Sequence, residues 1–272
     1  MLIVQLSDLH LHEYPPTLTP AHCITLIESE ISRLQRRREP LCVVVCGDLS
    51  YQGNPLIYDI ARGFLVSLRE RLGNRATLIL CPGNHDCDEN APAGSEFAAF
   101  TSSASVLGQY AWFGNAIRVA TRTAHGVDFV VANSTFHNDH LYGKVDTTQL
   151  EEHLIESARR RNRTVLILHH HLLPREARGR SAVWNADDVY RLVLEHEVPL
   201  ILHGHIHEDA PRIANWRRGA LIGAASLFSL GAENGFNIVR FGRSGARRLW
   251  VYRYNHLERR FDRKSVFVRP WR

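Results

Sequence analysis

Short apolar runs alternate with longer amphipathic stretches over the first 207 residues of the chain. The apolar runs predict strands over Leu2–Leu6, Leu41–Cys46, Thr77–Cys81, Phe129–Ala132, Val165–Leu168 and Leu200–Leu202. The stretches between them carry apolar residues at helical spacing and predict helices over Pro20–Arg38, Pro55–Leu72, Thr147–Arg161 and Asp187–Glu197. Strands that alternate with helices favour parallel pairing with right-handed crossovers.

The pattern changes after residue 207. Further runs with turn signals between them predict an antiparallel second sheet over Arg212–Asn215, Ala220–Ala224, Asn237–Phe241 and Arg248–Tyr254. Two stacked sheets with helices outside fit one α/β domain over residues 1–272, a four-layer α-β-β-α sandwich of two stacked mixed sheets flanked by helices. Residues 90–124 are rich in Ala, Ser, Gly and aromatic residues and predict a cap segment over the site.

Composition excludes several classes of protein. No stretch of eighteen uncharged apolar residues occurs, so neither a transmembrane helix nor a membrane partner is expected. The first residues run directly into Ser7-Asp8 without a basic region or a cleavage site, which indicates a buried strand and favours a cytoplasmic protein. The five cysteines are an odd number, which argues against a disulfide framework.

The formal net charge is +5, and the excess is local. Residues 240–272 hold ten arginines and one lysine against two acidic residues. This basic terminal region is able to hold an anionic partner such as nucleic acid, although a solvated face of terminal strands is the commoner origin of such charge. The oligomeric state does not follow from the sequence.

Polar groups follow the predicted strands directly. They are Asp8-Leu9-His10, Gly47-Asp48, Gly83-Asn84-His85-Asp86, His169-His170-His171 and Gly204-His205-Ile206-His207. Side chains two residues apart on an extended chain point the same way, so Asp8 can act with His10. Carboxylate, amide and imidazole donors gathered at strand ends suit divalent transition metals. The pattern therefore predicts a two-metal hydrolytic site.

In this order, the five groups resemble the calcineurin-like metallophosphoesterase superfamily over residues 8–207. The last group has the two-histidine form. With Gly53 after the second group, and Gly143 and Gln149 before the fourth, it is similar to class III cyclic nucleotide phosphodiesterases and their glycerophosphodiesterase relatives. The resemblance implies a metal-dependent phosphoric ester hydrolase.

The resemblance also implies a ligand for each metal position. One metal ion would be held by Asp8, His10 and His207, the second by Asn84, His170 and His205, and both by Asp48. Mixed oxygen and nitrogen ligands suit Mn²⁺, Fe²⁺/Fe³⁺ or Zn²⁺. A water shared by two cations loses a proton readily and is expected to be the nucleophile, as a hydroxide between the metals.

Two residues of the third group have catalytic duties by the same resemblance. His85 would stand beside the scissile phosphate, and Asp86 would hydrogen-bond His85 and fix its orientation. Three residues are expected to contact the substrate, namely Asn84, His85 and His171.

The triple histidine leaves its ligand open. If the strand continues through it, His169 and His171 face one way and His170 the other. Relatives that read His-His-His-Pro at this point place the ligand at His170, which makes His169 a packed strand residue.

These features favour a phosphodiesterase that acts on a small nucleotide-like or glycerol-type substrate. The basic terminal region keeps a nuclease or nucleic-acid end-processing enzyme as an alternative. A phosphoprotein phosphatase is a further alternative, against which the two-histidine last group argues. A metal-binding scaffold without turnover is disfavoured because every ligand type is present together with His85.

Overall fold

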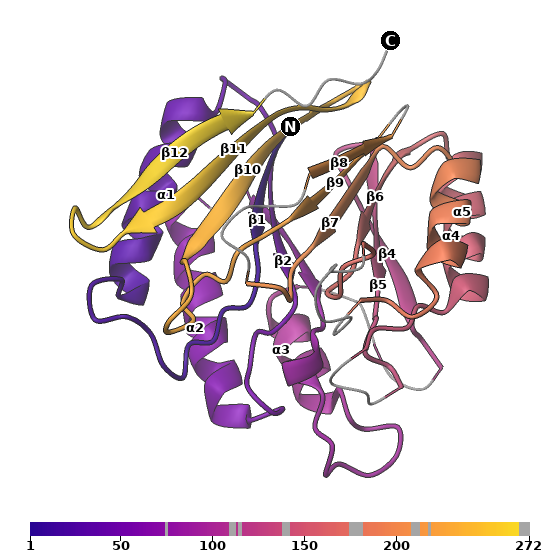
Figure 1. The fold of residues 1–272 in the computed structure, drawn as a ribbon, viewed down its shortest axis with the longest axis horizontal. Coiled ribbons are helices and arrows are strands. Elements are labelled where there is room, and N and C mark those ends of the chain that lie inside the picture. The colour runs from indigo at the N-terminus through magenta and orange to yellow at the C-terminus, as the bar shows by residue number, and fades with distance from the viewer. Residues whose placement is uncertain are drawn as a thin grey trace.

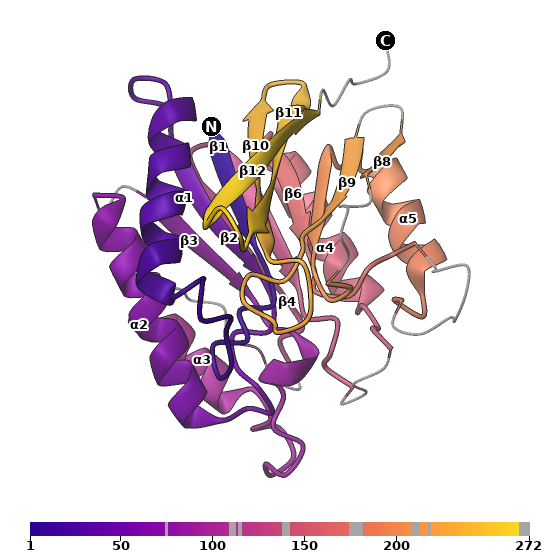
Figure 2. The same cartoon turned by 60° about the vertical axis from the view of Figure 1, so that its left-hand side comes forward.

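Two six-stranded mixed sheets face each other, and helices cover their outer faces (Figures 1 and 2). The computed structural model describes residues 1–73, 76–108, 113, 116–137, 142–173, 182–207, 213–216 (backbone only) and 219–266. The first sheet has the order β12 (Arg260–Val266), β11 (Gly245–Asn255), β10 (Gly235–Gly242), β1 (Leu2–Leu6), β2 (Leu41–Cys46) and β3 (Ala76–Cys81). The second has the order β4 (Val119–Ala124), β5 (Val127–Ala132), β6 (Arg163–Ile167), β7 (Leu200–His203), β9 (Gly219–Gly223) and β8 (Ile213–Trp216).

The helices form the outer layers (Figure 1). Three helices lie on the side of the first sheet: α1 (Pro20–Leu34), α2 (Pro55–Arg71) and α3 (Ala98–Val106). Two helices lie on the side of the second sheet: α4 (Thr147–Arg159) and α5 (Ala186–Glu195). Local chemistry sets where they begin: the side chains of Thr19, Asn54 and Asp146 cap α1, α2 and α4 by accepting backbone N–H groups. Among the described residues, no helix is both long enough and apolar enough to cross a membrane. The predicted α/β sandwich is confirmed.

The core lies in two layers because side chains alternate along each strand. On β6, Val165 and Ile167 belong to the core that the two sheets share. Leu166 and Leu168 instead pack in a separate cluster with α4 and α5. This alternation also decides where side chains beyond the end of β6 point.

The prediction of an antiparallel second sheet after residue 207 is wrong. Strands β10, β11 and β12 extend the first sheet through antiparallel pairing of β10 with β1, while β9 pairs parallel with β7. The apolar pattern predicts that these segments are strands but contains nothing about their partners. A buried hydrogen bond from Asn237 to Gln5, 3.1 Å long, joins β10 to β1.

Residues 90–124, predicted as a cap, contribute α3 and the edge strand β4 to the described structure. A position of this segment over the site stays a prediction. The five cysteines are buried free thiols, as their odd number suggested.

Asp128 on β5 ties the start of this strand to the end of α4. Its fully buried carboxylate accepts hydrogen bonds from Thr123, Asn162 and Arg160. Burial by itself raises the pKa of Asp128, but these hydrogen bonds outweigh burial and the pKa is lowered. A lowered folded-state pKa stabilises the protein above the unfolded-state value of about 3.9, and the benefit is lost as the pH falls below it.

Replacing Asp128 by Asn is therefore expected to cost about 2 kcal/mol of unfolding free energy at pH 7, because donors lose a charged acceptor. The gap in unfolding free energy between wild type and variant should narrow below about pH 4, where the Asp128 carboxylate of the unfolded wild-type chain takes up a proton before that of the folded protein. Urea unfolding from pH 3.5 to 7 measures it. Asp59→Asn, at an exposed site on α2, is the control. A gap that does not change with pH would contradict the prediction.

Candidate metal centre

The predicted donor residues converge at the carboxyl ends of parallel strands. β1, β2 and β3 run in register, with Leu6 opposite Val45 and Cys46 opposite Cys81, so the segments that follow them leave the same sheet edge. The backbone links the first two segments directly, because the N–H of Asp8 donates to Gly47 O at 3.0 Å. Open α/β sheets place their ligand sites at this edge.

The backbone conformation of the donors is unusual. Of the eleven non-glycine residues with positive φ in the described part of the chain, five are candidate ligands: Asp8, His10, Asp48, His205 and His207. Positive φ is unfavourable for these side chains, and such strain gathers at functional sites. Asp8 and His10 therefore meet as predicted, but through left-handed turns rather than along an extended chain.

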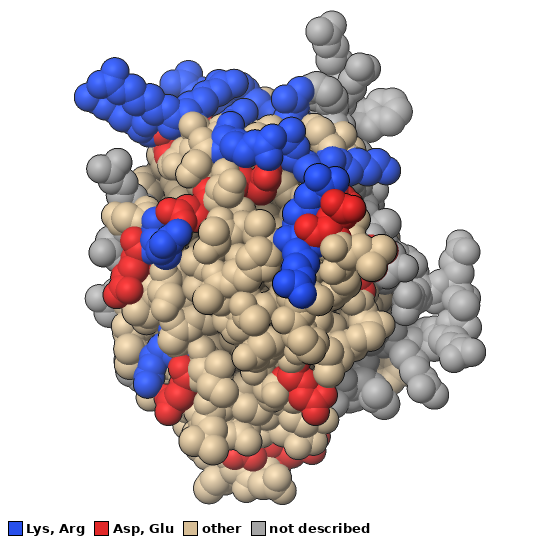
Figure 3. Space-filling view, turned by 90° about the vertical axis from the view of Figure 1, so that its left-hand side faces the viewer, with Lys and Arg blue, Asp and Glu red and all other residues tan. Residues whose placement is uncertain are grey.

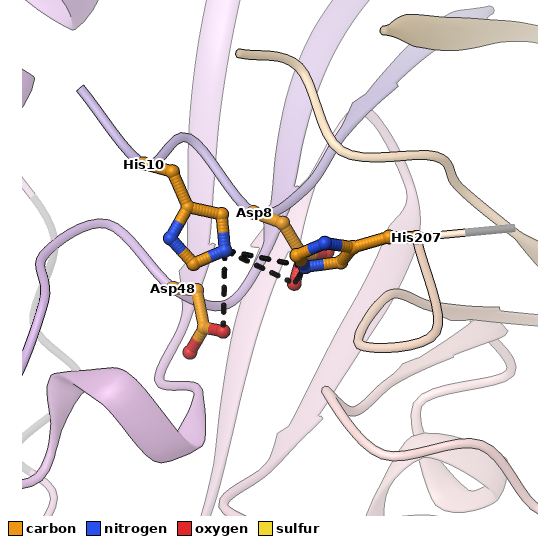
Figure 4. A group of neighbouring side chains, drawn as sticks. All are labelled: Asp8, His10, Asp48 and His207. Atoms are coloured by element: carbon orange, nitrogen blue, oxygen red, sulfur yellow. Dashed lines mark hydrogen bonds and ion pairs between the residues drawn. The ribbon is translucent and has the colours of Figure 1, made fainter. Parts of the chain in front are cut away.

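The first donor group consists of Asp8, His10, Asp48 and His207 (Figure 4). One ligand atom from each lies within 4.8 Å of the others. The Nε2 atom of His207 is 2.9 Å from Asp8 Oδ1 and 3.2 Å from His10 Nε2. His10 Nε2 is 4.0 Å from the carboxylates of both Asp8 and Asp48.

The second donor group consists of Asp48, Asn84, His169 and His205. Asn84 Oδ1 is 2.8 Å from His169 Nε2 and 3.0 Å from His205 Nδ1, and the two nitrogens are 3.1 Å apart. Asp48 Oδ2 is 3.4 Å from His169 Nε2 and 4.0 Å from His10 Nε2. Asp48 therefore belongs to both groups.

The chemistry of both groups fits cations. Carboxylate and amide oxygens and imidazole nitrogens crowd within hydrogen-bond distance of one another, and a pair of imidazole nitrogens can share only one proton between them. Burial lowers the pKa of His10 to about 4 and that of His205 to about 3, which keeps both rings neutral and able to bind metal. Burial also opposes charge on His169, yet Asp48 raises its pKa to about 9. A proton there offsets carboxylate charge that a metal ion would offset when bound.

His169, and not His170, joins the donor groups. His169 lies on the face of Val165 and Ile167, which looks toward the first sheet. His170 directs its Nδ1 to Ser134 Oγ at 2.9 Å, and its ring packs beside that of His205 with centroids 4.3 Å apart. The alignment that placed the ligand at His170, and His169 in the packing, disagrees with these positions.

His85 lies beside the first donor group, and its place next to a scissile phosphate stays a prediction. Its ring centroid is 5.5 Å from that of His10, and its backbone N–H donates to Asp48 Oδ1 at 2.9 Å. The side chain is more exposed than those of Asp48 and Asn84. His85 therefore stands at the open edge of the first donor group.

The Asp86 carboxylate anchors the loop that carries Asp48, and a hydrogen bond from it to His85 stays a prediction. This carboxylate accepts the N–H groups of Leu49, Ser50 and Gly83 and the hydroxyl of Tyr58, at 2.9–3.2 Å. Burial, followed by the charge of Asp48, raises the pKa of Asp86 to about 7. Asp86 thus holds the loop that carries Asp48, and it acts on His85 through the backbone.

His171 was expected to contact the substrate, but its side chain is fully buried. Its ring centroid is 6.3 Å from those of His203 and His205. Two further rings adjoin His85 beyond the predicted site residues: Tyr51, whose ring stacks on that of His85, and His12, which contacts Tyr51. Their spacing relative to the donor groups gives no signal, since the contacts arise from loop geometry.

Two glycines let the loops approach. A Cβ atom at Gly83 would collide with the backbone and carboxylate of Asp48, and one at Gly204 would collide with Ser7 and Asp8. Only Gly fits at these two positions, because a neighbouring donor loop lies directly against the backbone of each.

The family model of calcineurin-like phosphoesterases matches residues 1–209, which contain every member of both donor groups. The chain belongs to the calcineurin-like phosphoesterase family. The strands β10–β12, which complete the first sheet, lie beyond the match. With its candidate metal centre, this phosphoesterase is a metal-dependent phosphoester hydrolase.

Solved structures share the fold of the phosphoesterase. A dimetal phosphatase from Danio rerio is 13% identical, with a TM-score of 0.61 over 99% of each chain. A putative 5′-nucleotidase from Staphylococcus aureus is 15% identical, with a TM-score of 0.54 over 98% of this chain and 54% of its own. A comparison with curated proteins finds no match.

Proposed function

We propose that this phosphoesterase hydrolyses phosphodiester bonds of a small nucleotide-like or glycerol-type substrate with two metal ions. The observation that carries the proposal is the pair of donor groups that share Asp48, with His85 at their open edge. The two-histidine group, similar to that of class III cyclic nucleotide phosphodiesterases, supports a diester over a monoester. Manganese, iron and zinc all suit the donor set.

The donor groups set the charge of the site. Asp8 and Asp48 are the two carboxylates among the seven ligands, and Asn84 contributes a neutral oxygen. Two divalent cations would therefore leave an excess of positive charge, which attracts the single negative charge of a phosphodiester. When bound, the metal ions would acidify a shared water and offset the charge on phosphorus-bound oxygens.

His85 supplies the proton transfer in this proposal. Its half-exposed ring at the edge of the first donor group can reach the leaving oxygen of a bound diester and protonate it. Asp48 fixes the backbone of His85, and Asp86 fixes the loop of Asp48. Asp86 therefore supports His85 indirectly, through the backbone of the loop that follows Asp48.

Replacing His85 by Ala is expected to leave both metal ions bound and to reduce turnover about a hundredfold to ten-thousandfold, the usual contribution of a general acid. Elemental analysis and steady-state kinetics measure the two effects. His153→Ala, at a histidine on α4 away from the site, is the control. Loss of metal in the His85 variant would show that the assigned role is wrong.

A substrate comparison tests the proposed reaction. Hydrolysis of bis-p-nitrophenyl phosphate, with little hydrolysis of p-nitrophenyl phosphate, is the expected result in the presence of Mn²⁺. The rates of hydrolysis of cyclic nucleotides and of glycerophosphodiesters are then compared, one for each proposed substrate class. A clear preference for the monoester would contradict the diesterase proposal and favour the phosphatase alternative.

The nuclease alternative rests on the basic residues of the terminal region, which lie at both ends of β11 in the structure. Arg240 lies opposite Arg248 and opposite Leu2, at the start of β1, roughly 13 Å of strand from Leu6, the last residue of β1 before Asp8. Arg260 lies at the other end of β11, and residues 267–272 lie outside the described residues. Figure 3 shows Lys and Arg side chains gathered at the end where the N-terminus lies.

Nucleic-acid binding through the basic terminal region therefore remains a separate proposal, favoured by this gathering of charge. Neutralising Arg247 and Arg248 should weaken salt-sensitive binding of DNA or RNA if that surface holds phosphates. The same change should leave the hydrolysis of a small diester unchanged, since these residues lie near the amino end of β1.

A further inference from the structure

Three rings lie in contact beside the candidate metal centre. The Tyr51 ring stacks on that of His85, with centroids 4.9 Å apart and planes 19° apart. The His12 ring lies 4.6 Å from Tyr51, tilted by 30°. They come from the loops after β1, β2 and β3, and the backbone joins two of these loops because Gly53 N–H donates to His85 O at 2.9 Å.

Successive ring contacts connect the first donor group with the protein surface. His10, a member of the first donor group, is 6% exposed, His85 is half-buried, and Tyr51 is 37% exposed. His12 is also exposed. The outer two rings therefore offer aromatic surface next to the residue that would protonate the leaving group. Other aromatic side chains, such as Tyr14, are also exposed, and what distinguishes Tyr51 is that its ring stacks on His85.

We propose that Tyr51 and His12 form a subsite that binds a planar group attached to the scissile phosphate, with a nucleobase as the chemical class. This inference rests on the proposed function and selects its nucleotide-like substrate over the glycerol-type one. Any nucleobase can stack on Tyr and His rings, whatever its hydrogen-bonding groups, because every base has a π-face. A glycerol group has no such face and gains nothing from the subsite.

Direct binding measures the subsite apart from turnover. Calorimetry on the metal-loaded protein compares adenosine 5′-monophosphate with ribose 5-phosphate, which differ by the base alone. The nucleotide is expected to bind at least about tenfold more tightly, the usual contribution of a stacked base. Tyr51→Ala should reduce that ratio to near one while the affinity for ribose 5-phosphate stays the same. Tyr51→Phe, which keeps the ring, should preserve the ratio.

His12→Ala is the second variant and should lower the ratio in part, which keeps the test valid if Tyr51→Ala fails to fold. Equal affinity of the wild-type protein for the two ligands would overturn the subsite. A high ratio that survives both alanine variants would overturn it as well. The proposed function fails separately, through absent hydrolysis of bis-p-nitrophenyl phosphate, which contains no nucleoside.

Discussion

Replacing His169 by Ala is expected to remove one of the two bound metal ions and to reduce hydrolysis by at least about a hundredfold. Loss of groups that merely orient a ligand costs ten- to a hundredfold, so loss of a ligand should cost at least the upper value. The reason lies in three distances: His169 Nε2 is within 2.8–3.4 Å of Asn84, His205 and Asp48. Elemental analysis of the purified variant measures the metal content.

His170→Ala is the matched comparison, because this neighbouring histidine is equally buried but faces Ser134. We expect that variant to keep two metal ions and most of its activity. The opposite result, with metal lost from the His170 variant and kept in the His169 variant, would restore the alignment-based assignment and contradict the geometry.

Replacing Asp48 by Asn should reduce turnover roughly a thousandfold or more, equivalent to about 4 kcal/mol. Two cations repel each other, and the Asp48 carboxylate is the charge that lies between the two donor groups. Asn has nearly the same size and retains an oxygen that can accept the His85 N–H, so the change isolates the charge. Kinetics and metal analysis together measure the result.

The control for this variant is Asp187→Asn, at an exposed position in the first turn of α5. Two ions bound at unchanged affinity in the Asp48 variant would show that its carboxylate does not bridge them. The shared position of Asp48 in both donor groups would then have no functional meaning.

The sequence predicts much of the fold because the spacing of its apolar residues indicates which positions are buried. The runs at β1 and β2 and the caps of α1 and α2 are local features, and the structure shows the corresponding elements. Pairing is not local. Nothing near Asn237 in the chain indicates that it meets Gln5, so the sequence pattern alone places β10 in the wrong sheet.

The same division between local and non-local information applies to the site. Strand ends identify Asp8, Asp48 and Asn84, because polar residues directly after buried strands have no packing purpose. The alternation of side chains along β6 also indicates which histidine of the triple faces the first sheet, since His169 continues the face of Val165 and Ile167. The contacts of Asp86 and Tyr51 depend on how separate loops meet, which the sequence pattern does not report.

The most direct test of the account is a metal titration of the metal-free phosphoesterase. Mn²⁺ is added in steps while bound metal per chain and the hydrolysis of bis-p-nitrophenyl phosphate are measured together. We predict no hydrolysis without metal and full activity at two bound ions per chain. Full activity in the metal-free protein, or saturation of activity at a single bound ion, would contradict a two-metal phosphodiesterase.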